Sequence, residues 1–272
     1  MSKLVSVVVP CYNEEETLRI LYEELNRVTK SLPEYEFEYV FVNDGSKDGT
    51  LSVLKALAKE SPRVKYVSFS RNFGKEAGLL AGLTYAKGDL VATMDADMQD
   101  PPSLLPELIG YVESGEYDNA ATRRVTRKGE PVIRSFFARC FYKMMRHMTD
   151  INIVDGARDY RVMNRAMVDS ILSLQEYNRF SKGIFAWVGY ETKWVEFENV
   201  ERSAGETKWN FWKLLRYSVE GIVSFSNTPI NIASYLGLIL TVVSAFALLF
   251  IVGRALIFGD PVAGWPSTAS II

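Results

Sequence analysis

The first part of the chain alternates short apolar runs with segments whose apolar residues recur at helical spacing. Continuous β-branched and apolar runs predict strands, and apolar side chains that repeat every three to four positions predict helices. The predicted strands are 4–10, 37–42, 64–69 and 90–94, and the predicted helices are 14–32, 51–58 and 75–86. Apolar strands that alternate with helices are typical of an α/β fold with a mainly parallel sheet covered on both faces.

Three polar clusters follow predicted strands. They are the runs 10–15 (PCYNEE), 43–50 (NDGSKDGT) and 95–101 (DADMQDP). Taken singly, each has a structural explanation as a helix cap, a turn or a helix start. Together they converge on the carboxyl edge of one sheet, which is where such sheets bind ligands. Structure alone does not require a carboxylate at each crossing, so the clusters predict a binding site.

Two aspartates of the third cluster indicate a metal. Asp95 and Asp97 are separated by one residue beyond a strand, so their side chains are expected to point the same way. Two carboxylates can share Mg²⁺ or Mn²⁺ with a diphosphate, which makes a nucleotide diphosphate the expected ligand. The stretch 72–78 fits neither G-x-G-x-x-G nor G-x-x-x-x-G-K-[ST], which disfavours dinucleotide oxidoreductases and P-loop ATPases.

The clusters together resemble glycosyltransferase family 2. Its members carry P-x-Y-N-E, V-N-D-G-S-x-D-G-T and D-A-D-x-Q-D-P in this order, which residues 10–14, 42–50 and 95–101 match. Within the family, the chain is most similar to polyprenyl-phosphate glycosyltransferases of the bactoprenol glucosyltransferase and dolichyl-phosphate mannose synthase kind. The similarity extends from Val5 to about Trp212 and implies a GT-A (Rossmann-like) nucleotide-sugar domain.

The resemblance also implies roles for single residues. Asp95 and Asp97 would hold the metal and phosphate, with Gln99 near them and with Asp97 and Gln99 among the catalytic residues. The residues expected at the nucleobase and ribose are Pro10, Tyr12, Asn13, Glu14, Val42, Asp44 and Asp95. Tyr12 offers a stacking face, and Glu14 or Asp44 can accept hydrogen bonds from uracil N3 or ribose hydroxyls. The segment 175–180 lacks the Q-x-x-R-W of processive synthases, which favours transfer of a single sugar.

The C-terminal part of the chain is apolar. The chain has 31 Lys and Arg against 33 Asp and Glu, but only Arg254 and Asp260 carry charge after residue 227. Residues 235–252 carry no charge, and the stretch around them predicts a bilayer-spanning helix, with a buried core helix as the alternative. The predicted parts are a cytoplasmic GT-A catalytic domain (1–207), an amphipathic juxtamembrane segment (208–231), a transmembrane helix (232–258), and a loop that begins a second transmembrane helix (259–272).

The expected location is the cell (inner) membrane, with the catalytic domain cytoplasmic. Lys and Arg concentrate on the N-terminal side of the apolar stretch, and this side faces the cytoplasm under the positive-inside rule. The N-terminus lacks the pattern of a secretion signal, and Cys11 and Cys140 form no disulfide framework. A homo-oligomer would strengthen the anchoring that a single helix gives.

A basic segment is expected on the acceptor side. Bases concentrate in residues 123–146, and apolar residues in 133–148 recur at helical spacing, which predicts a basic amphipathic helix at the bilayer surface. The alternatives are a core helix with a solvated basic face and a nucleic-acid surface, which the apolar tail disfavours. The residues expected to hold the acceptor phosphate are Arg123, Arg127 and Arg134, together with Arg202 and Lys208 of a segment resembling the family's R-x-x-G-x-[ST]-K-[WY].

Residues 155–161 resemble the family's D-x-x-x-D-[FY]-R segment, whose aspartate is placed as the base that activates the acceptor. Asp159 takes this position, with Asp155 as the alternative candidate and a turn or cap as the structural explanation. A lipid monophosphate loses its second proton near pH ~6, so it needs little deprotonation at neutral pH. We therefore expect Asp159 to orient groups rather than to accept a proton.

The leading hypothesis is an inverting, metal-dependent transfer of one hexose, glucose from UDP-glucose, to polyprenyl (undecaprenyl) phosphate at the cytoplasmic membrane face. The expected cofactor is Mg²⁺ or Mn²⁺, and the expected partners are a nucleotide sugar, the lipid phosphate and the membrane, with no nucleic acid. The alternatives are a protein or glycan acceptor, a GDP-mannose donor, and a non-catalytic nucleotide-sugar-binding membrane scaffold. The intact Asp95, Asp97 and Gln99 speak against the scaffold.

Overall fold

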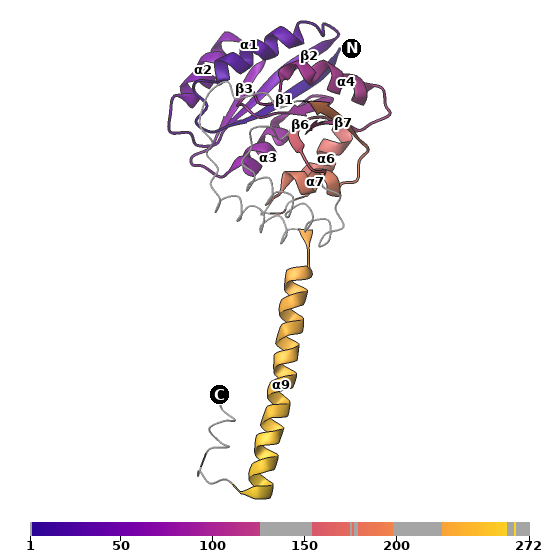
Figure 1. Cartoon of the computed structure of the whole chain (residues 1–272). Coiled ribbons are helices and arrows are strands. Elements are labelled where there is room, and N and C mark those ends of the chain that lie inside the picture. The colour runs from indigo at the N-terminus through magenta and orange to yellow at the C-terminus, as the bar shows by residue number, and fades with distance from the viewer. Residues whose placement is uncertain are drawn as a thin grey trace. The chain divides into compact units, whose positions relative to one another are not determined.

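The computed structural model describes residues 2–125, 154–174, 176, 179–197, 225–259 and 264. The chain divides into two compact units, Met1–Phe225 and Ser226–Ile272. The described part of the first unit is a sheet with helices packed on it, and that of the second is chiefly one long helix (Figure 1).

The first unit is built on one mixed sheet. Its strands in the described residues are β1 (Lys3–Cys11), β2 (Tyr35–Asn43), β3 (Val64–Ser68), β4 (Leu90–Thr93), β5 (Asn119–Arg124), β6 (Ala157–Asn164) and β7 (Thr192–Phe197). They form a 7-stranded sheet in the order β3-β2-β1-β4-β6-β5-β7. All neighbouring pairs are parallel except those of β6, which runs antiparallel to β4 and to β5.

This topology gathers the polar segments at one edge. Cys11 at the end of β1 pairs with Asn43 at the end of β2, and Thr93 ends β4 beside Arg161 of β6. Because β6 runs the other way, its first residues lie where its neighbours end. The three predicted polar clusters and the start of β6 therefore share the same edge of the sheet.

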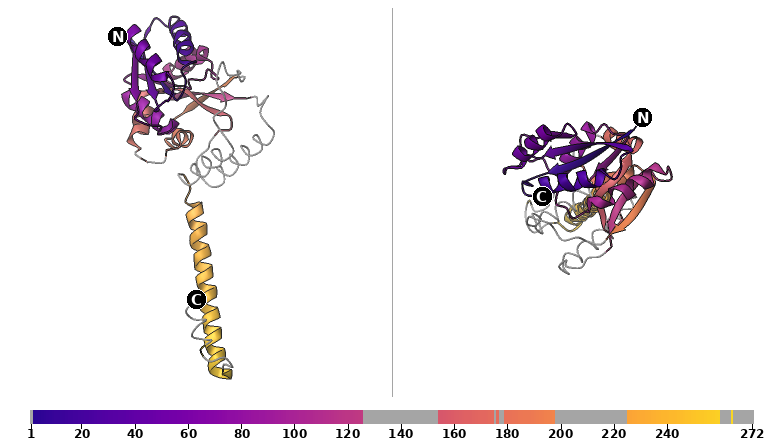
Figure 2. Two further views of the ribbon diagram at one scale, coloured as in Figure 1. Left: turned by 90° about the vertical axis from the view of Figure 1, so that its left-hand side faces the viewer. Right: turned by 90° about the horizontal axis from the view of Figure 1, so that it is seen from above.

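Helices cover both faces of the sheet (Figure 1, Figure 2). On one face lie α1 (Leu18–Thr29), α2 (Thr50–Glu60) and α4 (Leu105–Glu113), with the short 3-10 helix η1 (Pro102–Leu104) before α4. On the other lie α3 (Lys75–Tyr85), α6 (Arg165–Ser173) and α7 (Ser181–Trp187). The strands β1, β2 and β4 are therefore largely shielded from water on both sides, as their continuous apolar sequences predict.

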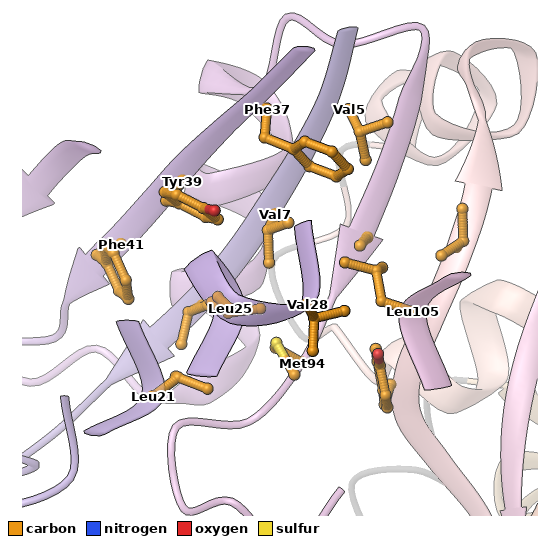
Figure 3. Close-up of a cluster of buried hydrophobic side chains, with 14 of the residues drawn as sticks. Val5, Val7, Leu21, Leu25, Val28, Phe37, Tyr39, Phe41, Met94 and Leu105 are labelled. Carbon is orange, nitrogen blue, oxygen red and sulfur yellow. The ribbon is translucent and has the colours of Figure 1, made fainter. Parts of the chain in front are cut away.

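Successive side chains of β1 enter different cores. Val7 packs in the core beneath α1, whereas Val8 packs in the core beneath α3. Figure 3 shows the first core, where Val7, Phe37 and Tyr39 of the sheet face Leu25 of α1. Burying an apolar side chain of this size contributes about 1.5–3 kcal/mol, so the two cores are the main source of stability for the sheet.

Helix α3 lies unusually close to the sheet. A Cβ at Gly82 would stand 2.2 Å from Val8 Cγ1, and one at Gly78 would stand 3.2 Å from Pro10 Cβ. A larger residue at Gly82 would require the Val8 side chain, the helix or the strand to shift, and one at Gly78 would require a small shift. The close packing brings Lys75, the first residue of α3, to the polar edge of the sheet.

Each strand and helix predicted from the periodicity within residues 4–94 is present, with its bounds shifted by a few residues. The largest shift is in the helix predicted at 14–32, since α1 begins only at Leu18 after Thr17. Asn13 of the first polar cluster has a positive φ of 54° and lies in the loop before the helix, so it does not cap α1, whose N-cap position is Thr17. The sequence pattern did not specifically predict the later elements, which are β5, β6, β7, α4, α6 and α7.

The second unit contains α9 (Thr228–Phe258). Within its span Ile230–Phe258, an 18-residue window has a mean hydropathy of 2.6, and none of that window is buried inside the structure. By length and composition the helix is able to cross a membrane, in agreement with the predicted transmembrane helix at 232–258. The predicted amphipathic helix at 133–148 and most of the juxtamembrane segment at 208–231 lie outside the described residues.

Candidate active site

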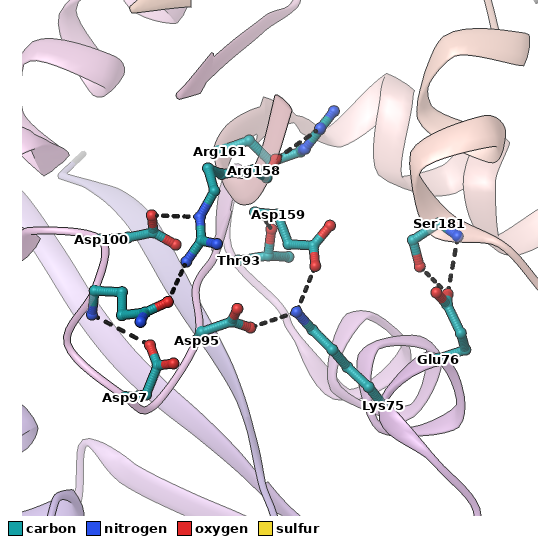
Figure 4. A network of polar contacts seen from close by, with 11 residues as sticks. Lys75, Glu76, Thr93, Asp95, Asp97, Asp100, Arg158, Asp159, Arg161 and Ser181 are labelled. Atoms are coloured by element: carbon teal, nitrogen blue, oxygen red, sulfur yellow. Dashed lines mark hydrogen bonds and ion pairs between the residues drawn. The ribbon is translucent and has the colours of Figure 1, made fainter. Parts of the chain in front are cut away.

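A network of charged side chains lies at the polar edge of the sheet (Figure 4). At its centre, Lys75 Nζ lies 2.6 Å from Asp95 Oδ1 and forms a second ion pair with Asp159 Oδ2. These three residues come from the start of α3, from the loop after β4 and from β6. The lysine thus joins the predicted metal-side aspartate to the predicted acceptor-side aspartate.

Asp159 is held as a carboxylate. Burial disfavours its charged form, but the nearby cations Lys75, Lys182 and Arg161 outweigh this effect and hold the pKa of Asp159 well below its usual range. Its Oδ1 is buried without a hydrogen-bond partner, and its backbone carbonyl accepts a 2.5 Å hydrogen bond from Thr93 Oγ1. A carboxylate with a lowered pKa is a weak proton acceptor.

The loop that carries the D-A-D-M-Q-D sequence is fixed by Arg158. Its Nε lies 2.8 Å from Asp100 Oδ1, and its Nη2 lies 3.4 Å from Gln99 Oε1. Within the loop, the Gln99 backbone N–H donates to Asp97 Oδ1 at 3.2 Å, and Met98 adopts the left-handed region with φ 59°. Arg158 stays protonated. Burial lowers its pKa, but the nearby carboxylates of Asp100, Asp95 and Asp159 outweigh this effect and raise the pKa above its usual range.

Asp95 and Asp97 offer oxygen ligands of the kind that Mg²⁺ and Mn²⁺ prefer. The two side chains are partly exposed, but they face different partners: Asp95 faces Lys75, and Asp97 lies beside Gln99 (Figure 4). In the described ranges no group of three or more His, Cys, Asp or Glu residues could hold a metal ion. Two carboxylates nevertheless fit a hard cation whose remaining ligands are phosphate and water oxygens.

The loop after β1 is bound to the loop after β2. The Asn13 backbone N–H donates to Ser46 Oγ at 3.0 Å, and Asn13 Oδ1 accepts from the Lys47 N–H at 2.9 Å. The Glu14 N–H donates to Thr50 Oγ1 at 2.9 Å. The first two predicted clusters are therefore one structural unit, with Tyr12 partly exposed beside it.

Asp44 holds the loop that leads into α3. It is only 3% exposed and accepts hydrogen bonds from the backbone N–H groups of Phe73, at 2.6 Å, and Gly74, at 2.9 Å. Burial raises the pKa of Asp44, and these two hydrogen bonds oppose the rise. Gly45 has φ 62°, and a Cβ there would lie 2.3 Å from the backbone carbon of Arg71. The N-D-G sequence therefore also has a clear structural function.

Two other residues predicted at the nucleotide pack against α3. Val42 is fully buried, and its Cγ2 lies 3.4 Å from the position of a Cβ at Gly82. Pro10 is partly buried in β1 and lies under Gly78. In this conformation both side chains support the base of the site rather than line an open surface.

On the acceptor side, the structure describes one of the five predicted bases. Arg123 lies at the end of β5 opposite Ala157, and its side chain is 40% exposed. Its Nε donates to the Asp155 carbonyl at 3.2 Å, and its Nη1 lies 3.7 Å from Glu196 Oε1. Arg127, Arg134, Arg202 and Lys208 lie outside the described residues.

No site role was predicted from the sequence for Lys75, Arg158 or Arg161. The Arg161 guanidinium stacks 3.7 Å from the centre of the Phe185 ring, and burial lowers its pKa to about 10 although Asp159 opposes the change. The sequence offered one signal for Lys75, which lies between Gly74 and the regularly spaced Gly78 and Gly82. In the structure Gly74 has φ 95°, and Gly78 and Gly82 pack closely against the sheet. No local signal marked Arg158, because its partners lie more than fifty residues away.

Comparison with known proteins identifies the family. Residues 6–172 match the model described as Glycosyl transferase family 2. The bactoprenol glucosyl transferase of Shigella phage SfV is 41% identical over 263 residues, an alignment that covers 97% of this chain and 85% of the relative.

Solved structures share the fold. The mannosyltransferase PcManGT from Pyrobaculum calidifontis, in complex with GDP-Man and Mn²⁺, is 19% identical with a TM-score of 0.56, covering 100% of this chain and 80% of the other. The glucosyl-3-phosphoglycerate synthase from Mycobacterium tuberculosis, in complex with Mn²⁺, UDP-glucose and phosphoglyceric acid, is 21% identical with a TM-score of 0.51, covering 79% and 76%. The predicted family and GT-A fold are confirmed.

Proposed function

Because the chain belongs to glycosyl transferase family 2, we propose that it transfers one glucose from UDP-glucose to undecaprenyl phosphate, with inversion at the anomeric carbon. The observation that carries this proposal is the 41% identity to a bactoprenol glucosyl transferase over 97% of the chain. The similarity is not confined to the nucleotide-binding half, so it supports a shared acceptor as well as a shared donor. That the chain is a glycosyltransferase follows from the family alone.

The proposed cofactor is Mg²⁺ or Mn²⁺ on Asp95 and Asp97. The oxygen ligands of these residues fit such a cation, and two structures of the same fold were solved with Mn²⁺ and a nucleotide sugar. A divalent cation at this position would neutralise the leaving diphosphate. Gln99, fixed between Arg158 and Asp97, would help to hold that side of the site.

The proposed role of Asp159 is to orient, not to accept a proton. Its ion pair with Lys75 and its lowered pKa make it a poor base. The acceptor phosphate is largely dianionic above pH ~6 and is therefore nucleophilic without help. The chain then has to place the phosphate in line with the anomeric carbon, which is the task proposed for Arg123, Arg127, Arg134, Arg202 and Lys208.

The nucleoside is proposed to bind over the joined loops after β1 and β2. Tyr12 supplies a partly exposed ring for stacking, and Asn13 and Glu14 lie next to it. The buried Asp44 and Val42 and the neighbouring Pro10 would form the floor of this region. Asp44 already accepts two backbone hydrogen bonds, and its carboxylate oxygens have lone pairs left for a uracil or ribose donor.

The proposed location is the cytoplasmic face of the cell membrane. Residues 1–207 would form the catalytic domain, 208–231 the juxtamembrane segment, 232–258 the transmembrane helix and 259–272 the start of a second one. The apolar α9 supports an anchor, and the excess of Lys and Arg before it supports the orientation. We also propose a homo-oligomer, because a single transmembrane helix gives weak anchoring and several copies would strengthen it.

A second donor deserves an equal test. The Pyrobaculum calidifontis mannosyltransferase was solved with GDP-Man, and its alignment covers this entire chain. The competing proposal is therefore a GDP-mannose donor with the same lipid acceptor. The two donors differ in the base, so a panel of UDP- and GDP-sugars in thermal-shift assays separates them, since ligand at 100 times its Kd adds about 2.7 kcal/mol of stability.

The test of the proposed function uses the full-length protein in detergent with radiolabelled UDP-glucose, undecaprenyl phosphate and Mn²⁺. The expected result is label in the organic phase that depends on both the lipid phosphate and the metal. The absence of any labelled lipid from UDP-glucose, GDP-mannose and other common nucleotide sugars would refute the proposal. Label that passes to a protein or glycan instead would support the alternative acceptor.

A further inference from the structure

The start of α3 is fixed from three directions. Asp44 accepts hydrogen bonds from the N–H groups of the two residues before the helix, Phe73 and Gly74. On the other side of Lys75, Glu76 accepts from the backbone N–H of Ser181 at 2.9 Å and from its hydroxyl. Gly82 holds the helix close to the sheet. The backbone of Lys75 is therefore immobilised, and its side chain is aimed at the site by the fold.

The ammonium of Lys75 occupies the place between two carboxylates. It lies 2.6 Å from Asp95 Oδ1 and also contacts Asp159 Oδ2. The lysine side chain is 37% exposed, compared with 24% for Asp95 and 14% for Asp159, so the more buried charges are the two anions. The Lys75 ammonium thus already compensates the negative charge of Asp95, the carboxylate that is proposed to bind the metal.

The Lys75 ammonium beside Asp95 opposes the binding of a divalent cation when no nucleotide is bound. A divalent cation on Asp95 would come close to the ammonium, and like charges repel strongly in a partly buried site. A nucleoside diphosphate changes the balance, because its phosphate oxygens can compensate the metal and the lysine together. Metal affinity should consequently depend on whether the diphosphate is present.

We propose that Lys75 is a resident counter-cation of the metal-side carboxylate, which makes the divalent cation bind well only together with a nucleoside diphosphate. The inference rests on the proposed function, specifically on Asp95 as a metal ligand. Lys75 is then a positioning residue of the site. The divalent cation and the nucleoside diphosphate bind together as one unit. The lysine keeps Asp95 and Asp159 in place until then.

The experiment measures Mn²⁺ binding to full-length protein in detergent by the electron paramagnetic resonance signal of free Mn²⁺, with and without UDP. Lys75→Met removes the charge and keeps most of the side-chain volume, whereas Lys75→Arg retains the charge. Lys59→Met is the matched control, because Lys59 is an exposed lysine in the last turn of α2. None of these measurements requires turnover.

Without UDP, Lys75→Met is expected to bind Mn²⁺ about tenfold more tightly than the wild type, because a repelling charge is gone. Lys75→Arg and Lys59→Met should match the wild type. With UDP present, the difference between Lys75→Met and the wild type should disappear or reverse. A purely structural lysine would not give an effect that depends on the nucleotide.

Equal Mn²⁺ affinities of Lys75→Met and the wild type without UDP would overturn the inference, provided that UDP still promotes Mn²⁺ binding to the wild type. If the wild type binds no Mn²⁺ even with UDP, the metal assignment of the proposed function fails instead. Lys75→Met removes the ion-pair partner of the buried Asp159 and can impair folding. The double variant with Asp159→Asn removes that charge, and the same tightening is expected of it.

Discussion

Asp97 is the residue on which the proposed metal chemistry depends most directly. Its side chain is partly exposed beside Gln99 rather than packed in a core, so its substitution should spare the fold. Asp97→Asn keeps an oxygen that can accept from the Gln99 N–H but removes the negative charge. We expect a loss of activity of about 10²–10³-fold in kcat, comparable to the loss of a group that stabilises developing charge.

The measurement for Asp97→Asn is the initial rate of lipid glucosylation in Mn²⁺, together with Tm. Asp169→Asn is the matched control, because Asp169 is a surface aspartate of α6 with a side chain that is 63% exposed. The control should keep full activity. Near-normal turnover of Asp97→Asn at saturating Mn²⁺ would be incompatible with the metal assignment.

Asp159→Asn distinguishes an orienting group from a base. The pKa of Asp159 is lowered, so its charge is lost only as pH falls through a value below the ordinary range of an aspartate. Between about pH 6 and 9 the residue does not titrate, and the acceptor has its own ionisation near ~6. We therefore expect a loss of about tenfold in kcat, with a pH profile that has the wild-type shape.

The pH–rate profile of Asp159→Asn should be recorded beside that of Asp155→Asn, which alters the alternative base. A general base at Asp159 would give a different result: turnover nearly absent, with a residual rate that rises as pH increases. Inactivity across the range, with normal binding of donor and lipid, would also show that the orienting role is wrong.

At the scale of single residues, the sequence predicted the motif residues but not the side chains that contact them. The three clusters could be recognised because each follows a strand in the sequence, and parallel strands bring such segments together. Lys75 and Asp159 are 84 positions apart, and no periodicity links them. The predicted common direction of Asp95 and Asp97 was not found in this conformation, because Lys75 attracts one carboxylate while the Gln99 N–H binds the other.

At the scale of elements, α3 is the part whose packing governs the site. A methyl group at Gly82 would stand 2.2 Å from Val8 Cγ1, so Gly82→Ala requires the buried Val8 side chain, the helix or the strand to shift. Overpacking of this kind costs about 1–3 kcal/mol of unfolding free energy. Because Lys75 begins the same helix, we also expect kcat to fall.

Gly110→Ala is the matched control for Gly82→Ala. Gly110 is an exposed glycine of α4, and a Cβ there would meet nothing within 4 Å. This substitution should raise the unfolding free energy by about 0.5–1 kcal/mol, since alanine favours helix more than glycine does. Urea unfolding of both variants checks the pair, and equal stabilities would contradict the close packing of α3.

The order of the elements was predictable only for the first half of the first unit. There, apolar strands and amphipathic helices alternate with clear periods, and β1 to β4 were found where they were expected. The strand β6 was not predicted, because its sequence ARDYRVMN mixes charged and apolar residues and its antiparallel pairing has no local signal. That strand supplies Arg158, Asp159 and Arg161, so three charged members of the network lie on a strand that the sequence did not indicate.

At the scale of the whole molecule, α9 is proposed to anchor the enzyme next to its lipid substrate. Phe246→Lys places a charge near the centre of the span Ile230–Phe258, where insertion of lysine costs about 2.5–3.5 kcal/mol. We expect a large fraction of this variant to leave the membrane in carbonate extraction. Its glucosylation rate with lipid in vesicles should fall in proportion.

Ile257→Lys is the control for the anchor, because a lysine at the end of the helix can extend its ammonium to the interface. Arg254 shows that this end already contains a charge. The control should stay in the membrane fraction. Equal extraction of both variants would indicate that α9 does not span the bilayer.

The most direct test of the whole account is the chemical identity of the product. Mass spectrometry and NMR of the lipid extract from a reaction with UDP-α-glucose, undecaprenyl phosphate and Mn²⁺ should reveal undecaprenyl phosphate that carries one glucose in β-linkage. Asp97→Asn should yield almost none of it. A lipid fraction that contains only unmodified undecaprenyl phosphate, although the donor is bound or hydrolysed, would contradict the proposed transfer.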